Sequence, residues 1–429
     1  AEYMGTALRW RDPEARKTLR GAHIMWTRAW VVLILVLCPW MLVPTAGIDS
    51  TTSQEIADAS ASFSLELLQT VLCGQSGNVL VSPVSVSVLL SMLQQGALER
   101  SRDELSAVLH LSPNSARDGY GHIARSLKKQ KTSSLVLEFA NKIYLQYGFE
   151  MVPEYKQTLI KDFLSDIETT NFLKPEEAAF QVNSWVSNVT HNRVNSLIVP
   201  DALSAQTQLL LVNGIYLKGV WLTPFRIEQT AEKSFSPSPG VEITVPIMHH
   251  TGKFRAGDDP SLGAKWVELP FDDEEFSMVL VLPHERHCLE KLVSQMKPQH
   301  LSNMLGTRGT KQVSLALPRF KLSTQMSLVP TLMKLGLTDV FTINSDLGGI
   351  TMRDETLSVS DIVQKAELEV NEKGGTASAA TGILVATLSL TVNPDELEFN
   401  ANHPFLAIVV HRVNSVPLFA GRVSDPSLS

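Results

Sequence analysis

An uncharged stretch near the carboxyl end of the chain limits the possible folds more than any other feature. From Gly374 to Asn393 the sequence has no charged residue and no proline. The preceding segment, Lys365–Asn371, alternates charged or polar with apolar residues, as a strand with one face in water does. Chain that leaves a strand is normally a polar turn, whereas this exit is long, rich in small residues and β-competent. It could itself become a central strand if two neighbouring strands of a sheet separated.

Two other interpretations of this stretch remain open. Gly374–Val392 is nearly long enough for a transmembrane helix, but its Gly, Ser, Thr and Val content and the lack of basic anchors downstream oppose that. It could also form an ordinary buried strand pair with its turn at Thr381-Gly382.

Composition indicates a globular protein with a large core. The chain has 429 residues, of which 44% are hydrophobic and 19% charged. Because no linker, charge block or repeat follows residue 50, we predict a single domain over residues 47–429. The formal net charge of −7 argues against general nucleic-acid binding, which needs a concentrated basic face.

The amino-terminal region has the pattern of a targeting segment. A short basic start at Met25–Arg28 precedes an apolar stretch over 29–43 and small residues over 44–47. We therefore predict a signal peptide over residues 25–46 and a secreted, extracellular protein, with an uncleaved signal anchor as the alternative. Residues 1–24 are interpreted as an upstream extension, with Met25 as the working start.

If the protein is secreted, a glycosylation sequon and the cysteines become informative. Asn188-Val-Thr190 is an N-glycosylation sequon, so Asn188 is a predicted glycan acceptor. Cys38 would leave with the signal peptide, and Cys73 and Cys288 are then either one disulfide or two free thiols.

Hydrophobic periodicity predicts helices early in the chain and strands later, which is an α+β class. The expected helices cover residues 54–73, 84–98, 179–189 and 327–337. The expected strands cover residues 208–216, 276–283, 313–320, 405–410 and 416–421.

Motifs for nucleotide binding, nucleophilic catalysis and metal binding are missing from the sequence. His249-His250 would point to opposite sides of a strand, and Asp272–Glu275 is best interpreted as a charged turn. We therefore expect no enzyme activity, no metal and no cofactor. Four basic residues that cluster on a probable helix could bind a sulfated polysaccharide or simply form a solvated face: Arg125, Lys128, Lys129 and Lys131.

Several ordered, widely spaced motifs resemble those of the serpin family over essentially all of residues 50–426. They are Val81–Ser85, Val182–Val186 with Thr190, Leu211–Trp221 with Phe225, Val245–His249, Leu317–Phe320, His403–Phe405 and Leu418–Arg422. The resemblance implies three β-sheets surrounded by eight or nine helices. It also implies a reactive-centre loop over about 372–393, which can enter the large central sheet as an extra strand.

The resemblance assigns roles to individual residues. The scissile bond would be Leu388-Ser389, with Leu390 as the alternative cleavage site. The hinge of the loop would comprise Glu372, Gly374, Gly375, Thr376, Ala377, Ser378, Ala379, Ala380 and Thr381. The sheet-opening region would comprise Ser82, Ser85, Asn213, Trp221, Arg319 and Gln364, with Glu372 paired to Arg319.

The residue chemistry of the loop agrees with insertion. One register would send Gly375, Ala377, Ala379 and Thr381 into the core, and none of these is charged. Three residues depart from the usual family pattern. Gly375 replaces a threonine or serine and adds backbone entropy to be lost. Thr376 stands where the family often has glutamate, and Gln364 stands where many members have histidine.

These features predict a monomeric, secreted inhibitor that acts as a suicide substrate. A chymotrypsin- or elastase-like serine protease would accept Leu388, form an acyl-enzyme and be trapped as the loop inserts. The alternatives are a non-inhibitory family member, such as a ligand carrier or chaperone, and an inhibitor of a cysteine protease.

Overall fold

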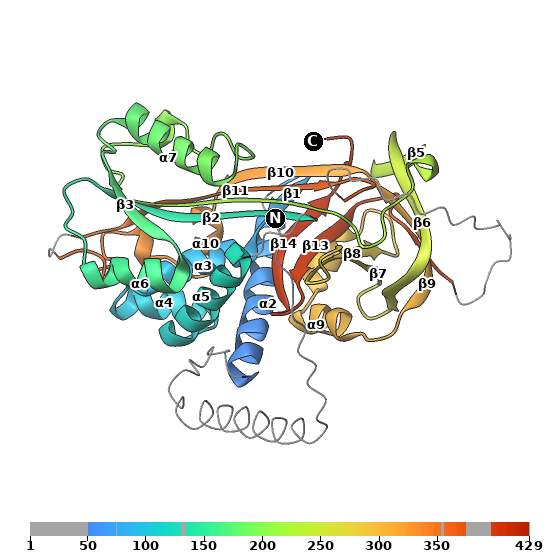
Figure 1. Cartoon of the computed structure of the whole chain (residues 1–429), viewed down its shortest axis with the longest axis horizontal. Helices are drawn as coiled ribbons and strands as arrows, with labels where there is room; N and C mark the ends of the chain where they lie inside the picture. The colour runs from blue at the N-terminus through green and yellow to red at the C-terminus, as the bar shows by residue number, and fades with distance from the viewer. Residues whose placement is uncertain (1–49, 74, 130–133, 353–355, 375–395, 429) are drawn as a thin grey trace, which may run out of the picture. The chain divides into compact units, whose positions relative to one another are not determined.

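The computed structural model describes residues 50–73, 75–129, 134–352, 356–374 and 396–428. Residues Ile48–Ser429 form one compact unit. Within the described residues it contains both long helices and extensive sheets, so the predicted α+β class is confirmed (Figure 1).

Nine α-helices lie within the described residues: α2 (Ser50–Cys73), α3 (Pro83–Gln94), α4 (Glu99–Leu109), α5 (Pro113–Lys129), α6 (Pro153–Phe163), α7 (Pro175–Val189), α8 (Leu289–Gln295), α9 (Pro298–Gly306) and α10 (Val329–Lys334). Proline stands in the first turn of α3, α6, α7, α9 and α10, where its missing N–H costs nothing. Every residue of α3 is buried.

Fourteen strands are described: β1 (Val79–Val81), β2 (Leu135–Gln146), β3 (Asp166–Thr170), β4 (Leu209–Gly219), β5 (Ala231–Ser238), β6 (Val241–Asp259), β7 (Ala264–Pro270), β8 (Phe276–Pro283), β9 (Lys311–Pro318), β10 (Phe320–Ser327), β11 (Val359–Val370), β12 (Leu397–Asn400), β13 (Phe405–His411) and β14 (Val416–Val423).

Five of these strands form a sheet in the order β10-β11-β4-β2-β3. The central strand β4 is buried along almost its whole length, because α7 lies on one face of this sheet and α3, α5 and α6 lie on the other (Figure 1). Strands covered on both faces read as continuous apolar runs, which is why residues 208–216 predicted a buried strand correctly.

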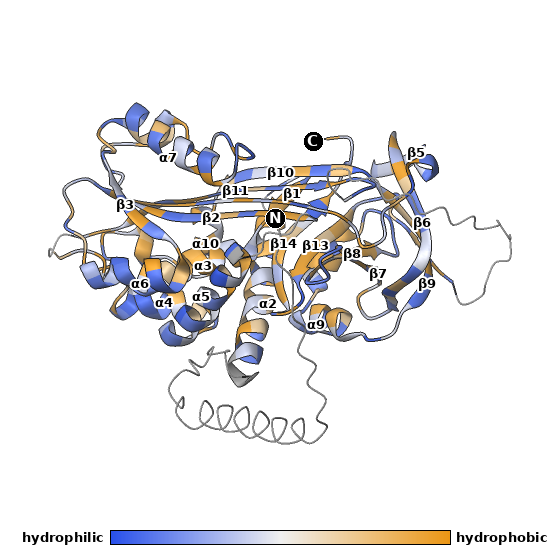
Figure 2. Ribbon diagram, in the orientation of Figure 1, coloured by the Kyte–Doolittle hydropathy of each residue, from blue (hydrophilic) through white to orange (hydrophobic). Residues whose placement is uncertain are grey.

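The other nine strands form a second, bent sheet that is joined through the long strand β6. The first part of β6 pairs with β5 and β9, whereas its last residues pair with β7. The predicted three sheets are therefore present, but two of them share β6 and are continuous. Strands β8, β13 and β14 are buried throughout and apolar in colour (Figure 2).

Three predicted elements need correction. The helix expected over 84–98 begins at Pro83 and ends at Gln94, and the chain then passes close to Ile350 at Gly96, where an added Cβ would lie 2.3 Å from Ile350 Cγ1. The strand expected over 313–320 is two strands, β9 and β10, in different sheets, since Pro318 has no N–H with which to continue the ladder. The helix expected over 327–337 is short and covers only α10.

Candidate functional site

The pairing of β4 with β11 is the unusual feature of the five-stranded sheet. These two neighbours run parallel, from Val359 opposite Leu209 to Leu368 opposite Leu217. Their outer neighbours, β10 and β2, are antiparallel to them. A strand that turned back from the end of β11 and entered between them would be antiparallel to both, and antiparallel pairing is slightly the more stable kind per residue.

The chain that leaves β11 turns at this same end of the pair. Gly374 has φ +74°, and a Cβ there would lie 2.3 Å from the carbonyl oxygen of Gly219, the last residue of β4. Trp221 N–H donates to the Lys373 carbonyl at 3.2 Å, and Phe225 N–H donates to the Glu372 carbonyl at 2.8 Å. The first hinge residues are thus held against the chain that follows β4, and only glycine fits at the tightest point.

Glu372 is held by an ion pair. Its carboxylate Oε1 accepts hydrogen bonds from Arg319 Nε at 2.6 Å and from Thr230 Oγ1 at 2.6 Å. Burial would by itself raise the pKa of Glu372, but the bonds from Arg319, Thr230 and its own N–H together hold that pKa below its ordinary value. The Glu372 side chain is 6% exposed, whereas that of Arg319 is 42% exposed, so water and salt reach one side of the pair.

Arg319 reaches this position because it joins two sheets. It lies between the end of β9 and the start of β10, and its N–H donates to the Pro246 carbonyl at 3.0 Å. The structure therefore brings Arg319 beside Glu372, although the expected continuous strand over 313–320 was wrong.

Trp221 closes the end of the β4–β11 pair. Its indole Nε1–H donates to the Asn371 carbonyl at 2.9 Å, and its ring stacks on Phe271 at 4.6 Å between centroids. The residue is only 3% exposed. A buried Trp whose N–H has a partner both fills space and orients the turn.

A second set of polar side chains lies midway along the same pair. Gln364 Nε2 donates to Asn213 Oδ1 at 2.9 Å and to the Ser82 carbonyl at 3.1 Å, while Gln364 Oε1 accepts from Ser82 N–H at 2.8 Å. Ser82 Oγ donates to Ser85 Oγ at 2.8 Å. We call this set, together with Asn141, the latch, because it joins β11 and β4 to the start of α3.

Asn141 on β2 extends the latch and was missed by sequence reasoning. Asn213 Nδ2 donates to Asn141 Oδ1 at 2.6 Å and to the Ala140 carbonyl at 3.2 Å. A buried amide must have a partner, but β2 also carries Glu138, Lys142 and Gln146, so the sequence of the strand gives only a weak signal for Asn141. Thr230, which binds Glu372, has no comparable signal in the sequence.

Several predicted residues lie outside the described part of the chain. The hinge residues beyond Gly374, which are Gly375, Thr376, Ala377, Ser378, Ala379, Ala380 and Thr381, are among them. So are the reactive residues Leu388, Ser389 and Leu390, Lys131, and the segments 1–24 and 25–46.

Two of the four basic residues proposed for polysaccharide binding have local partners. Arg125 donates to the carbonyl of Asp162, and Lys128 donates to the carbonyl of Leu164. Both carbonyls belong to the carboxyl end of α6, where cations near the helix terminus are stabilising. The side chain of Lys129 is outside the described residues.

The remaining predicted features are distributed elsewhere. Asn188 is exposed at the end of α7, whereas Thr190 is buried. Cys73 and Cys288 are free thiols. In the described ranges no group of His, Cys, Asp and Glu could hold a metal ion, and none of the helices there is long and apolar enough to cross a membrane.

Comparison with known proteins places this geometry in a family. The family model described as Serpin (serine protease inhibitor) matches residues 58–426. Serpin B4 of Homo sapiens is 30% identical over 390 residues, covering 86% of this chain and 99% of that protein. The leukocyte elastase inhibitor of Xenopus tropicalis is 30% identical over 381 residues, covering 87% of this chain and all (100%) of that protein.

A solved structure supports the same assignment. The crystal structure of Manduca sexta serine protease inhibitor (serpin)-12 matches with a TM-score of 0.79 and 32% identity, over 86% of this chain and 99% of that one. The chain therefore belongs to the serpin family and has the serpin fold, as the sequence motifs indicated. The family is one of protease inhibitors and not of enzymes.

Proposed function

We propose that this protein traps a serine protease as an acyl-enzyme by inserting its reactive-centre loop between β4 and β11. The observation that carries the proposal is the parallel β4–β11 pair, with the loop leaving from the end of that pair where Glu372 and Gly374 are held. Insertion breaks one parallel ladder and makes two antiparallel ones. Each added hydrogen bond contributes about 1 kcal/mol net, so the uninserted form is metastable and kinetically held.

The latch supports the same mechanism. Gln364 is buried, and both its amide oxygen and its amide nitrogen are hydrogen-bonded, to Ser82 and to Asn213, so glutamine replaces histidine here without leaving its own polar atoms unpaired. Opening the β4–β11 pair separates Gln364 from Asn213, and that cost forms part of the barrier that keeps the loop out before cleavage.

The scissile bond is proposed to be Leu388-Ser389, with Leu390 as the alternative. A protease pocket for large apolar residues would bind Leu388, and its serine would attack the Leu388 carbonyl. Insertion then displaces the bound enzyme and distorts its active site, where a shift of about 1 Å can reduce the rate a hundredfold.

The test is to mix the purified protein with chymotrypsin, elastase and a cathepsin, and to analyse the products on a denaturing gel. We expect a covalent adduct with a serine protease that accepts leucine. Cleavage without an adduct would indicate a non-inhibitory member, and an adduct only with the cathepsin would indicate a cysteine-protease inhibitor.

A melting experiment tests insertion separately from inhibition. Protein cleaved in the loop should unfold at a higher temperature than intact protein, because the extra strand adds ladder bonds and buried area. Equal melting temperatures of the cleaved and intact forms would contradict the insertion mechanism.

We further propose that the protein is secreted as a monomer and glycosylated at Asn188. The signal-like segment over 25–46 and the exposed position of Asn188 support this. Expression in secretory animal cells, followed by endoglycosidase treatment of medium and lysate, tests both points. Polysaccharide binding through Arg125, Lys128, Lys129 and Lys131 stays a prediction, which retention on a heparin column would test.

A further inference from the structure

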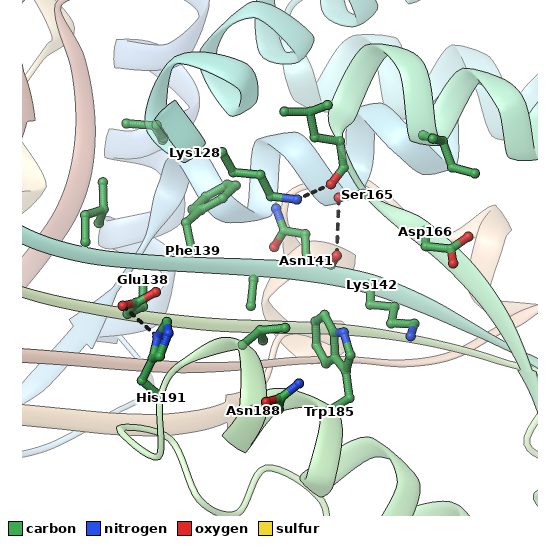
Figure 3. Close-up of a pocket in the computed structure, with 16 residues that line it drawn as sticks. Lys128, Glu138, Phe139, Asn141, Lys142, Ser165, Asp166, Trp185, Asn188 and His191 are labelled. Atoms are coloured by element: carbon green, nitrogen blue, oxygen red, sulfur yellow. Dashed lines mark hydrogen bonds and ion pairs between the residues drawn. The ribbon is translucent and has the colours of Figure 1, made fainter. Parts of the chain in front are cut away.

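A cavity of about 830 Å³ lies beside β2. Figure 3 shows the side chains of β2, α5 and α7 that line it, together with the chain that connects α6 to β3. Part of its wall is apolar and consists of Leu127, Leu137, Phe139, Ile160 and Leu164. Ile160 and Leu164 are 48% and 39% exposed, so this part of the apolar wall is open to water.

The backbone of β2 supplies hydrogen-bond donors to the same cavity. Strand β2 pairs with β4 from Leu135 to Leu145, but with β3 only from Lys142 onward. Odd-numbered residues of β2 direct their backbone groups away from β4, since Tyr147 N–H bonds Thr170 while Gln146 N–H bonds Gln208. The outward N–H of Phe139 therefore has no strand partner within the described residues, and it faces the side on which the cavity lies.

Lys128 is the cation in this cavity that lacks a carboxylate partner. Among the described residues, Lys142 pairs with Glu168, and the His191 ring lies 2.9 Å from a Glu138 oxygen. Lys128 instead donates to the Leu164 carbonyl, which leaves two of its three N–H donors for a ligand. Desolvation lowers the pKa of Lys128, and a nearby anion would act in the opposite direction by stabilising its charged form.

Asn141 adds an unsatisfied buried donor. It is 4% exposed and lines the cavity, and its Nδ2 has no hydrogen-bond partner within the described part of the chain. Ser165 Oγ donates to the Asn141 carbonyl at 3.2 Å, next in sequence to the Leu164 carbonyl that Lys128 binds. The Lys128 ammonium and the Asn141 amide thus meet at the same turn, as Figure 3 also shows.

We propose that this cavity binds a small organic carboxylate with an apolar body. The apolar body would cover Phe139, Ile160 and Leu164, and the carboxylate would accept hydrogen bonds from Lys128 and from the unpaired donors of β2 and Asn141. An anion is favoured over a cation because the acidic groups of the wall already have partners: Glu138 lies against His191, and Asp166 against Lys156.

Asn141 also connects this cavity to the latch, so occupancy should slow loop insertion. Asn141 Oδ1 accepts from Asn213, which is bonded to Gln364 across the β4–β11 pair. A ligand that holds Asn141 therefore stabilises the closed sheet. This second step rests on the proposed function, whereas binding itself does not.

Calorimetric titration with sodium laurate, kept below its micelle concentration, tests binding. The protein is made in bacteria, so that Asn188 at the cavity wall carries no glycan. We expect one laurate per chain, about tenfold weaker binding to Lys128→Met, and unchanged binding to Lys161→Met, a matched exposed lysine of α6 outside the cavity. Dodecylammonium, which has the same chain and the opposite charge, should bind wild-type protein at least tenfold more weakly, a comparison that needs no variant.

Three outcomes would overturn the site: no binding of laurate up to about 1 mM, equal binding by Lys128→Met, or equal binding of dodecylammonium. Saturating laurate should also slow adduct formation severalfold relative to ligand-free protein, and an unchanged rate would overturn the coupling. If no protease forms an adduct, the proposed function has failed while the calorimetric result stands independently.

Discussion

The β4–β11 pair is held closed in two places that differ in their chemistry. The latch midway along the pair consists of neutral groups that are fully buried, with Asn213 at 0% and Gln364 at 1% exposure. The hinge end depends instead on the ion pair between Glu372 and Arg319, of which Arg319 is 42% exposed. Water and salt therefore do not reach the latch, whereas they reach the ion pair between Glu372 and Arg319.

The latch and the ion pair should therefore differ in how much they stabilise the sheet and in how they respond to pH and salt. Removing one member of a buried neutral network leaves its partner unbonded, which costs the full desolvation penalty of that partner. Such a network does not respond to pH or salt. A half-exposed ion pair is worth little, about 0–1 kcal/mol, yet acid and salt weaken it. We therefore expect the latch to contribute more than the ion pair to the stability of the closed β4–β11 pair, and the ion pair to be the part that responds to pH and salt.

The largest effect is expected from a charge on the loop segment that is proposed to insert between β4 and β11. Thr381→Arg would place a cation at an inward position of the inserted strand, which costs several kcal/mol when it is unpaired. Adduct on a denaturing gel should fall at least a hundredfold, with cleavage retained, whereas Thr381→Ser should still form adduct. Adduct formation by the arginine variant would contradict insertion past the latch.

Removal of the central latch residue should have the next largest effect. Asn213→Leu leaves Gln364 and Asn141 with unsatisfied buried groups, so the free energy of unfolding in urea should fall by about 2–4 kcal/mol. Asn344→Leu, at an exposed position, is the matched control and should change it by less than about 0.5 kcal/mol. Equal losses in the two variants would show that the latch has no special role.

A comparison of two glycine substitutions can distinguish the cost of backbone strain from the cost of close packing at Gly374. Gly240 and Gly374 both have positive φ, at +77° and +74°, but only Gly374 has atoms within 4 Å of an added Cβ. Gly240→Ala should cost about 1 kcal/mol of unfolding free energy, and Gly374→Ala about 1–2 kcal/mol more, because Gly219 and Trp221 must shift. Equal costs measured by urea unfolding would mean that the contact with Gly219 is easily relieved.

The smallest expected effect is the pH dependence of the contribution that Glu372 makes to the free energy of unfolding. The folded-state pKa of Glu372 lies below its ordinary value near 4.5, so its stabilisation is complete above pH 4.5 and is lost as pH falls through the lowered pKa. The difference in unfolding free energy between wild type and Glu372→Gln should therefore be at most about 1 kcal/mol at pH 7 and should vanish in acid. A difference that persists below pH 3, or that resists high salt, would place the pair in a more buried setting than the structure gives it.

The site was predictable to the extent that its residues carry local signals. Asn213 stands out as a polar residue in an apolar run, and Trp221 and Arg319 lie in recognisable motifs. Gln364 was assigned by the family resemblance, because β11 alternates polar and apolar residues and does not single it out. Asn141 has a weaker local signal than Asn213, since β2 also carries Glu138 and Lys142, and its contact with Asn213 depends on the register between β2 and β4. Thr230 follows a single 3₁₀ turn, Ile227–Gln229, and nothing nearby in the sequence indicates that its hydroxyl binds Glu372.

The sequence by itself determined the α+β class, the buried run that becomes β4, and the uncharged segment after Glu372, because side-chain periodicity and charge are local properties. Only the tertiary structure decided that β11 lies parallel to β4 and that Arg319 crosses between two sheets to meet Glu372. It also decided that β2 leaves a donor-lined cavity beside Lys128. These are contacts between segments far apart in the chain, and they depend on register and packing that no local pattern encodes.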